Sequence, residues 1–202
     1  MSNYYLNQFL KLKCAGDVIN SVSKMSKAEK EITESMAIIK KLKPITLLNP
    51  MKYSVMDLCA GNALTSVLAV HLLPIISATA IDKKKRKGHY EIVKKFQYLE
   101  MDVKDAVIAD TDILIAVHPC KTADLIVDLF NNFPAKALIM MPCCNGLSND
   151  VLCKTWLRTK LPEYDLWTYH LAQKIKSAQV NIFTDVFVES PKRNIILARR
   201  GK

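Results

Sequence analysis

The sequence predicts an α/β fold with a mostly parallel sheet that helices cover on both faces. Two observations lead to this prediction. From residue 52 onward, five short apolar runs alternate with segments of helical period, and near its end the chain has two further strand-like runs in succession. Alternation of this kind is typical of βαβ units, whereas two consecutive strands with a turn between them form an antiparallel hairpin.

The apolar runs are rich in branched residues, which favours buried strands. They are "SVMDL" (54–58), "SATAID" (77–82), "FQYLEMD" (96–102), "DILIAVH" (112–118) and "KALIMM" (136–141). The closing hairpin consists of "VNIFTDVFVES" (180–190), a tight turn at "PKR" (191–193) and "NIILARR" (194–200). Together these runs predict a sheet of seven strands.

Helices are expected ahead of the first strand. Ser26 and Glu29 have the spacing of a capping box, and the helix that they begin continues in helical steps until Pro44 stops it. Residues 3–20 predict another helix that is broken near Gly16. We therefore expect residues 1–46 to form an N-terminal helical cap, which packs on the domain or covers a substrate, and residues 47–202 to form the main domain.

The chain is basic, with 29 Lys and Arg against 19 Asp and Glu and a formal net charge of +10. An excess of this size favours a polyanionic partner. The densest basic run is "DKKKRK" (82–87), which is either a solvated helix start or a contact with nucleic acid.

Nothing in the sequence predicts a membrane span or secretion. No apolar run reaches the ~20 residues that cross a bilayer, and the first residues lack the arrangement of a signal peptide. We therefore expect no membrane partner and a cytoplasmic location, where the six cysteines are thiols and not a disulfide framework.

Polar residues follow the first strands of the predicted sheet. Asp57 ends the first run and Gly61 lies in the turn after it, while Asp82 and Asp102 end the second and third runs. Ligands of open parallel sheets bind beyond these strand ends, where a carboxylate such as Asp82 accepts hydrogen bonds from ribose hydroxyls. The turn lacks the G-x-G-x-x-G pattern, which argues against NAD. As alternatives, Asp82 caps a helix and Asp102 is a solvated turn residue.

The turn "DLCAGNA" (57–63) resembles the first motif of class I S-adenosylmethionine-dependent methyltransferases, D/E-x-G-x-G-x-G. Asp57 and Gly61 match this motif, while Cys59 and Ala63 replace its outer glycines with small residues. The resemblance extends over roughly residues 50–200. It implies a Rossmann-like fold, S-adenosylmethionine as cofactor and a methyltransferase domain at 47–202. The implied cofactor-binding residues are Asp57, Cys59, Gly61, Asn62, Ala63, Asp82 and Asp102.

A narrower resemblance lies in "VHPCKTADLI" (117–126) and "MPCCN" (141–145). These segments are similar to the H-x-C-x-x-x-D and P-C-C motifs of a group that includes tRNA acceptor-stem 2′-O-methyltransferases. Lys121 stands where the group often has glycine, and Asn145 and Gly146 stand where it often has an aromatic residue and histidine. The resemblance implies an RNA acceptor, with tRNA favoured. The implied substrate-pocket residues are Lys121, Asp124, Pro142, Cys143, Cys144 and Asn145.

Two strands that we expect to be neighbours, about 4.8 Å apart, are followed by His118, Cys120, Cys143 and Cys144. We therefore expect these four side chains to meet. In our preferred interpretation they line a substrate pocket without a metal, and His118 and Cys120 are the catalytic residues, with His118 accepting a proton. Three alternatives stay open. The four residues bind zinc, Cys120 attacks a pyrimidine ring covalently, or the cysteines are inert core residues.

The function expected from these features is methyl transfer from S-adenosylmethionine to RNA. The altered glycines favour a second possibility, a catalytically weak or inactive S-adenosylmethionine-binding module or scaffold. A third possibility is a methyltransferase that acts on a protein or a small molecule.

Overall fold

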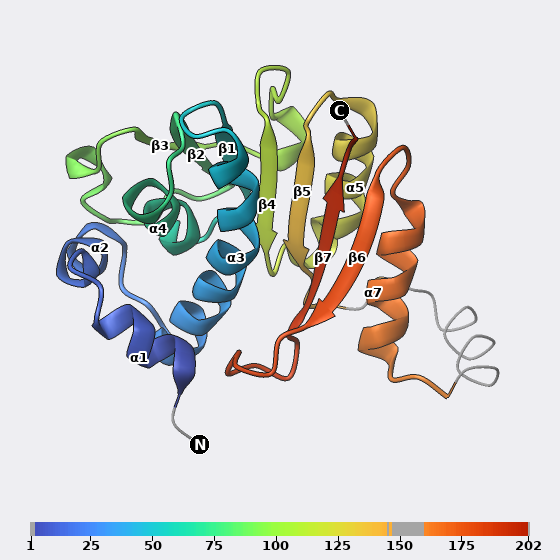
Figure 1. The fold of residues 1–202 in the computed structure, drawn as a ribbon, viewed down its shortest axis with the longest axis horizontal. Coiled ribbons are helices and arrows are strands. Elements are labelled where there is room, and N and C mark those ends of the chain that lie inside the picture. Colours follow the sequence, from blue (N-terminus) through green and yellow to red (C-terminus); the bar gives the residue numbers. More distant parts are fainter. Residues whose placement is uncertain (1–2, 145, 147–159, 202) are drawn as a thin grey trace.

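The computed structural model describes residues 3–144, 146 and 160–201 and has an α/β architecture (Figure 1). Its sheet has seven strands in the order β3-β2-β1-β4-β5-β7-β6. The strands are β1 (Ser54–Leu58), β2 (Ser77–Asp82), β3 (Phe96–Glu100), β4 (Ile113–Val117), β5 (Ala137–Met141), β6 (Gln179–Thr184) and β7 (Asn194–Arg199). The first five strands are parallel, and β7 is antiparallel to β5 and β6. The predicted Rossmann-like fold with an antiparallel C-terminal hairpin is confirmed.

Helices cover both faces of the sheet (Figure 1). They are α1 (Tyr4–Leu10), α2 (Ala15–Ser21), α3 (Ala28–Leu48), α4 (Leu64–Leu72), α5 (Ala123–Asn132) and α7 (Glu163–Lys174). The helices α1 to α4 pack on one face, and α5 and α7 pack on the other. Within the described part of the chain, no helix is both long and apolar enough to cross a bilayer.

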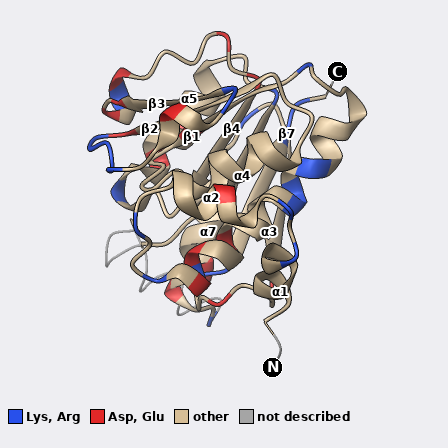
Figure 2. Ribbon diagram, turned by 90° about the vertical axis from the view of Figure 1, so that its left-hand side faces the viewer, with Lys and Arg blue, Asp and Glu red and all other residues tan. Residues whose placement is uncertain are grey.

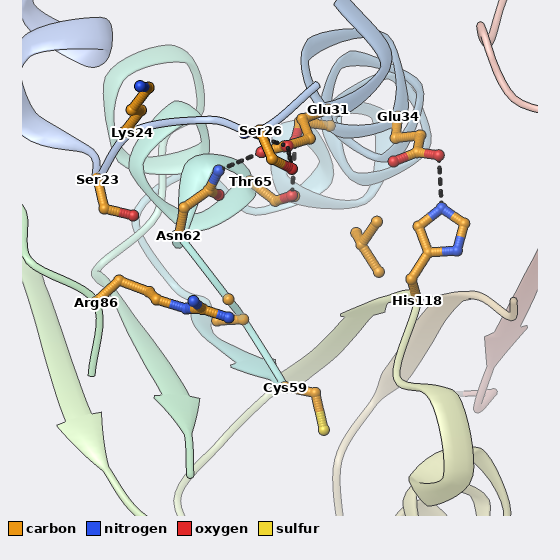
Figure 3. A pocket seen from close by; sticks show the side chains of 14 residues that line it. Ser23, Lys24, Ser26, Glu31, Glu34, Cys59, Asn62, Thr65, Arg86 and His118 are labelled. Atoms are coloured by element: carbon orange, nitrogen blue, oxygen red, sulfur yellow. Dashed lines mark hydrogen bonds and ion pairs between the residues drawn. The ribbon is translucent and has the colours of Figure 1, made fainter. Parts of the chain in front are cut away.

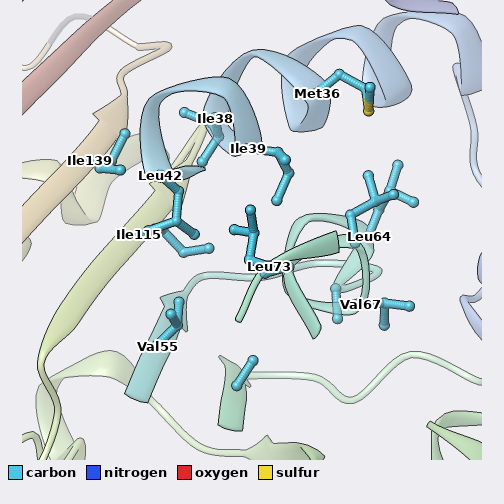
Figure 4. Close-up of a cluster of buried hydrophobic side chains, with 14 of the residues drawn as sticks. Met36, Ile38, Ile39, Leu42, Val55, Leu64, Val67, Leu73, Ile115 and Ile139 are labelled. Atoms are coloured by element: carbon cyan, nitrogen blue, oxygen red, sulfur yellow. The ribbon is translucent and has the colours of Figure 1, made fainter. Parts of the chain in front are cut away.

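The two cores follow from the alternation of side chains along each strand. In β4, Ile113 and Ile115 point into the core beneath α3, while Leu114 points into the core beneath α5. The packing of α3 on the sheet through Ile38 and Leu42 is shown in Figure 4. Because both faces are covered, β4 and β5 are apolar along their whole length, as the sequence pattern predicted.

The helix α3 differs from its prediction at both ends. It begins at Ala28 without a side-chain cap from Ser26, and Glu31 takes the place of Glu29 in accepting the hydrogen bonds of the preceding turn. It also continues through Pro44 to Leu48, so the predicted stop is wrong. Pro44 lies on the exposed face of the helix, where water can satisfy the carbonyl group that its missing N–H leaves free. The expected boundary between residues 46 and 47 falls inside this helix.

The C-terminal hairpin lacks the predicted tight turn. Residues 185–193 connect β6 and β7 in a long loop, because this segment packs on the N-terminal helices. The Asp185 carboxylate accepts a hydrogen bond from the Tyr5 hydroxyl at 2.6 Å, and the Thr33 hydroxyl accepts one from the Glu189 backbone N–H at 3.0 Å. The loop therefore joins the end of the sheet to α1 and α3.

Candidate functional site

The turn after β1 has an unusual backbone. Cys59, Gly61 and Ala63 have φ values of 61°, 57° and 59°, so every second residue is left-handed. These are the three positions that are glycine in D/E-x-G-x-G-x-G. Glycine adopts this conformation freely, whereas other residues do so at a cost of roughly 1–2 kcal/mol. The turn therefore keeps the backbone of a glycine-rich loop although two of its three glycines are replaced.

Groups from β2 and β3 hold this turn in place. The Asp82 carboxylate accepts a hydrogen bond from the Gly61 N–H at 2.9 Å, and the Tyr98 hydroxyl donates one to the Gly61 carbonyl at 2.6 Å. The Tyr90 hydroxyl donates to the Asn62 carbonyl at 3.0 Å. Burial raises the pKa of Tyr98 well above its ordinary value, which keeps the hydroxyl protonated as a donor. Three consecutive peptide groups of the turn are thus oriented by side chains from β2, β3 and the segment between these strands.

Replacing Tyr98 with phenylalanine should lower the free energy of unfolding by about 1 kcal/mol, because the Gly61 carbonyl loses its donor. Chemical denaturation measures this change. Tyr4→Phe is the control, since Tyr4 is 42% exposed and lies away from the turn. Equal stability of the two variants would contradict the support that we assign to Tyr98.

Asp57 lies beneath the turn, at the end of β1, and is only 2% exposed. Its Oδ2 accepts a hydrogen bond from the Ser66 hydroxyl at 2.6 Å, while its Oδ1 is buried without a hydrogen-bond partner among the described residues. Burial raises the pKa of Asp57 to about 7 because the charged form loses its hydration. Asp57 lines neither of the cavities described below, and the hydrogen bond that it accepts comes from Ser66 on α4.

A polar cavity of about 320 Å³ lies between the turn and the N-terminal part of α3 (Figure 3). Glu31 closes one side, where its Oε1 accepts hydrogen bonds from the segment before α3 and its Oε2 accepts one from the Asn62 amide at 2.5 Å. Lys24 and Arg86 bring positive charge to the same cavity. The cavity therefore offers charges of both signs within a small volume.

His118 lines the polar cavity from the end of β4. Its Nε2 lies 2.6 Å from Oε1 of Glu34 on α3 (Figure 3). Its backbone N–H donates to the Met141 carbonyl, and its φ of 53° turns the side chain at the strand end. Glu34 is 3% exposed, and the sequence prediction missed it. The signal in the sequence was a second carboxylate three residues after Glu31, which a helix places on the same face as Glu31.

An apolar cavity of about 510 Å³ adjoins the polar one at Cys59, which lines both. Asp82 and Asp102 lie along it, and its apolar walls come from Ile81, Met101 and Val103. The pKa of Asp102 is below its ordinary value because the Lys104 backbone N–H and the Lys83 side chain donate hydrogen bonds to its carboxylate. The structure thus gathers Cys59, Gly61 and Asn62 of the turn around these two cavities, together with Asp82 and Asp102. Asp57 and Ala63, which were also predicted to bind the cofactor, are buried and line neither cavity.

Three of the four residues predicted to meet beyond β4 and β5 do so. The Cys120 and Cys143 sulfurs are 3.2 Å apart, and those of Cys143 and Cys144 are 3.4 Å apart. Burial, followed by hydrogen bonds with its two neighbours, raises the pKa of Cys143 to about 12, so this thiol is protonated and a poor nucleophile. His118 does not join the group, because its Nε2 faces Glu34.

The other residues predicted for a substrate pocket lie in different places. Lys121 lines the apolar cavity, and Pro142 is buried directly after β5. Asp124 forms an ion pair with Lys174 between α5 and α7 and lines neither cavity. Asn145 lies outside the described residues.

No protein-family model matches the chain, and no protein of the curated set does. Solved structures do resemble it. A precorrin-6y C5,15-methyltransferase from Geobacter metallireducens is 14% identical, with a TM-score of 0.52 over 83% of this chain and 87% of that one. The plantazolicin methyltransferase BpumL, solved with SAH, is 12% identical, with a TM-score of 0.55 over 98% and 95% of the two chains.

A variant of MtNAS solved with S-adenosylmethionine is 9% identical, with a TM-score of 0.56 over 98% of this chain and 71% of that one. At these identities the likeness concerns the fold. The chain therefore shares the Rossmann-like architecture of these proteins.

Proposed function

We propose that this protein binds S-adenosylmethionine and transfers its methyl group to an acceptor. The observation that carries the proposal is the pair of adjoining cavities at the carboxyl ends of β1 to β4, one apolar with carboxylates along it and one charged. This is the edge of the sheet where open α/β folds bind ligands, at the point where strand order reverses between β1 and β4. The fold-level likeness to proteins solved with S-adenosylmethionine or SAH supports it.

The residues of the apolar cavity fit an adenosine group. Asp82 offers carboxylate oxygens to ribose hydroxyls, and Asp102 offers an acceptor to the adenine amino group. Ile81, Met101 and Val103 provide apolar surface against which an aromatic base can pack.

The residues of the polar cavity fit an amino-acid group. Lys24 and Arg86 suit its carboxylate, and Glu31 suits its ammonium group. Cys59 lies where the two cavities join, so a ligand that occupies both passes over the left-handed turn. Cys59 itself is held by a hydrogen bond between its sulfur and the Thr122 hydroxyl at 3.0 Å.

The cofactor, when bound, supplies an electrophilic methyl group on a sulfonium centre. In this chain, His118 would remove the proton of the acceptor. An ionised Glu34 only accepts hydrogen bonds, so the His118 Nε2 must carry the proton of the 2.6 Å contact. The Nδ1 atom then keeps its lone pair and acts as the base. Glu34 is the positioning residue that selects this tautomer.

We propose RNA, with tRNA favoured, as the acceptor, and the cytoplasm as the location of the protein. Besides the sequence resemblance, it is supported by the net charge of +10 and by the basic connection 83–87. This connection is exposed and borders both cavities, with Lys83 on the apolar one and Arg86 on the polar one. Figure 2 shows basic and acidic positions interspersed along the ribbon in that view, so the case for RNA depends on this connection. The helices within residues 1–46 would form the cap that encloses the acceptor.

Two measurements test the proposal. Calorimetry should detect binding of S-adenosylmethionine, and incubation with the labelled donor should transfer label to total RNA and not to a protein extract. Absence of binding would contradict the proposal as a whole. Binding without transfer to any pool would favour a binding module, and label in protein alone would overturn the choice of RNA.

Replacing Asp82 with alanine should weaken binding of S-adenosylmethionine by at least about 100-fold. The variant loses its acceptors for the ribose and also the anchor of the Gly61 N–H, and a hydrogen bond to a charged group contributes about 1.5 to 3 kcal/mol. Calorimetry measures the affinity, and circular dichroism checks the fold. Asp105→Ala is the matched control, because Asp105 is exposed and lines neither cavity. Wild-type affinity in Asp82→Ala would show that the carboxylate has been misassigned.

A further inference from the structure

We propose that Cys120, Cys143 and Cys144 form a zinc site with three protein ligands and a fourth coordination position that is open to the apolar cavity. Their sulfurs all lie within 4.8 Å of one another. The inference stands apart from methyl transfer, because a bound metal is measured without the cofactor or an acceptor.

The register of two strands brings these cysteines together. Val117 pairs with Met141 at the ends of β4 and β5, which lie side by side (Figure 1). Cys120 follows its strand by three residues, and Cys143 and Cys144 follow theirs by two and three. Cys120 has a φ of 49°, an uncommon conformation for a residue with a side chain. The chain thus reaches the same point from two strands that α5 separates in sequence.

The distances suit a single ion. Zinc binds cysteine sulfur at about 2.3 Å, which places two tetrahedral ligands about 3.8 Å apart. The observed separations of 3.2 Å and 3.4 Å are shorter than this value by roughly half an ångström. Cys120 and Cys144 are exposed, so their side chains have room to make this adjustment.

Packing does not explain the cluster. A free cysteine that serves only the core is buried and behaves as a small apolar residue. Cys143 is buried, yet Cys120 and Cys144 are exposed and lie against the same cavity. Three thiols that converge at the surface of a cavity are instead a set of soft ligands.

The ligand type selects the metal. Thiolates favour zinc and other soft cations, whereas Mg²⁺ and Ca²⁺ require oxygen ligands. The group contains no carboxylate among the described residues. His118 does not complete the set as a fourth ligand, because its Nε2 lies 2.6 Å from Glu34. The site therefore differs from the closed four-ligand arrangement of structural zinc.

The fourth coordination position of the proposed site is open to ligands that enter through the apolar cavity. Cys120 and Cys144 both line the apolar cavity, so an ion that they hold is accessible from it. Zinc sites with three protein ligands keep a water or another small ligand in the fourth position. An incoming nitrogen, oxygen or sulfur donor would displace that water.

Metal analysis of the full chain, purified with a phosphine reductant and zinc and then desalted, tests the site. We expect one zinc per chain in the wild type and loss of stoichiometric zinc in Cys120→Ser, Cys143→Ser and Cys144→Ser. Cys14→Ser is the matched control, since Cys14 lies on the N-terminal segment outside the group, and it should keep its zinc. A zinc-free wild type, or equal loss in Cys14→Ser, would overturn the proposal.

A second measurement needs no variant and so does not depend on whether a variant folds. Zinc-loaded wild type should protect Cys120, Cys143 and Cys144 from alkylation, as mapped by mass spectrometry, and a chelator should remove this protection. Alkylation at the same rate with and without zinc would overturn the site. Cobalt-substituted protein tests the open position, because imidazole should shift its absorption bands. An unchanged spectrum would overturn the fourth position that we assign.

Discussion

Replacing His118 with glutamine is expected to lower kcat by about 100- to 10,000-fold, the range that general acid–base catalysis contributes. Glutamine has an amide that can still donate to Glu34, but it has no nitrogen that accepts a proton at neutral pH. The effect should therefore appear in kcat, while the affinity for S-adenosylmethionine changes little. Single-turnover transfer of a labelled methyl group, measured beside calorimetry, separates the two quantities.

Glu34 is tested with the same assay. Glu34→Gln keeps the size of the side chain but allows the amide to donate, so it no longer selects the His118 tautomer. We expect a smaller loss of kcat than for His118→Gln, and no further loss when both changes are combined, because the two residues act as a unit. A wild-type rate in His118→Gln would exclude His118 as the base. Additive losses would exclude the positioning role of Glu34.

Replacing Asp57 with asparagine is expected to stabilise the protein above neutral pH. Asp57 is buried with a pKa of about 7, compared with an ordinary value of 3.8. The folded state therefore holds this proton more tightly than the unfolded state does. As the pH rises from about 4 to about 7, the wild type loses stability that the asparagine variant does not lose. Above pH 7 the difference should be on the order of 4 kcal/mol, because one pKa unit corresponds to 1.36 kcal/mol.

Urea denaturation at several pH values measures this difference. The two proteins should have similar stability near pH 4, and the variant should become the more stable one as the pH rises. Asp110→Asn is the control, because Asp110 is exposed at the opposite end of the sheet, and its curve should follow that of the wild type. A constant difference between wild type and Asp57→Asn at all pH values would contradict a raised pKa.

The part of the candidate site that lies at the strand ends was the most open to prediction. Asp57, Gly61, Asp82 and Asp102 each end or follow a strand, and the carboxyl ends of parallel strands meet at one edge of the sheet. Once the strands are recognised, these residues must lie near one another. The left-handed backbone at Cys59 and Ala63 could also be anticipated, since both stand at glycine positions of the motif.

The polar cavity could not be predicted in the same way. Glu34 and His118 are 84 residues apart, and their contact depends on how α3 lies across the sheet. No local pattern in either segment specifies that packing. The same is true of the β6–β7 connection, which packs on α1 through Asp185 and Tyr5.

By itself the sequence determined the seven strands, the two covered faces and the strand-end residues, because these depend on periodicity and on neighbours in the chain. Only the tertiary structure decided that Glu34 orients His118, that α3 continues past Pro44, and that three thiols meet without His118. These features depend on how segments that are distant in the sequence pack against one another. In α3, for example, burial of the whole helix outweighs a single local signal such as a proline.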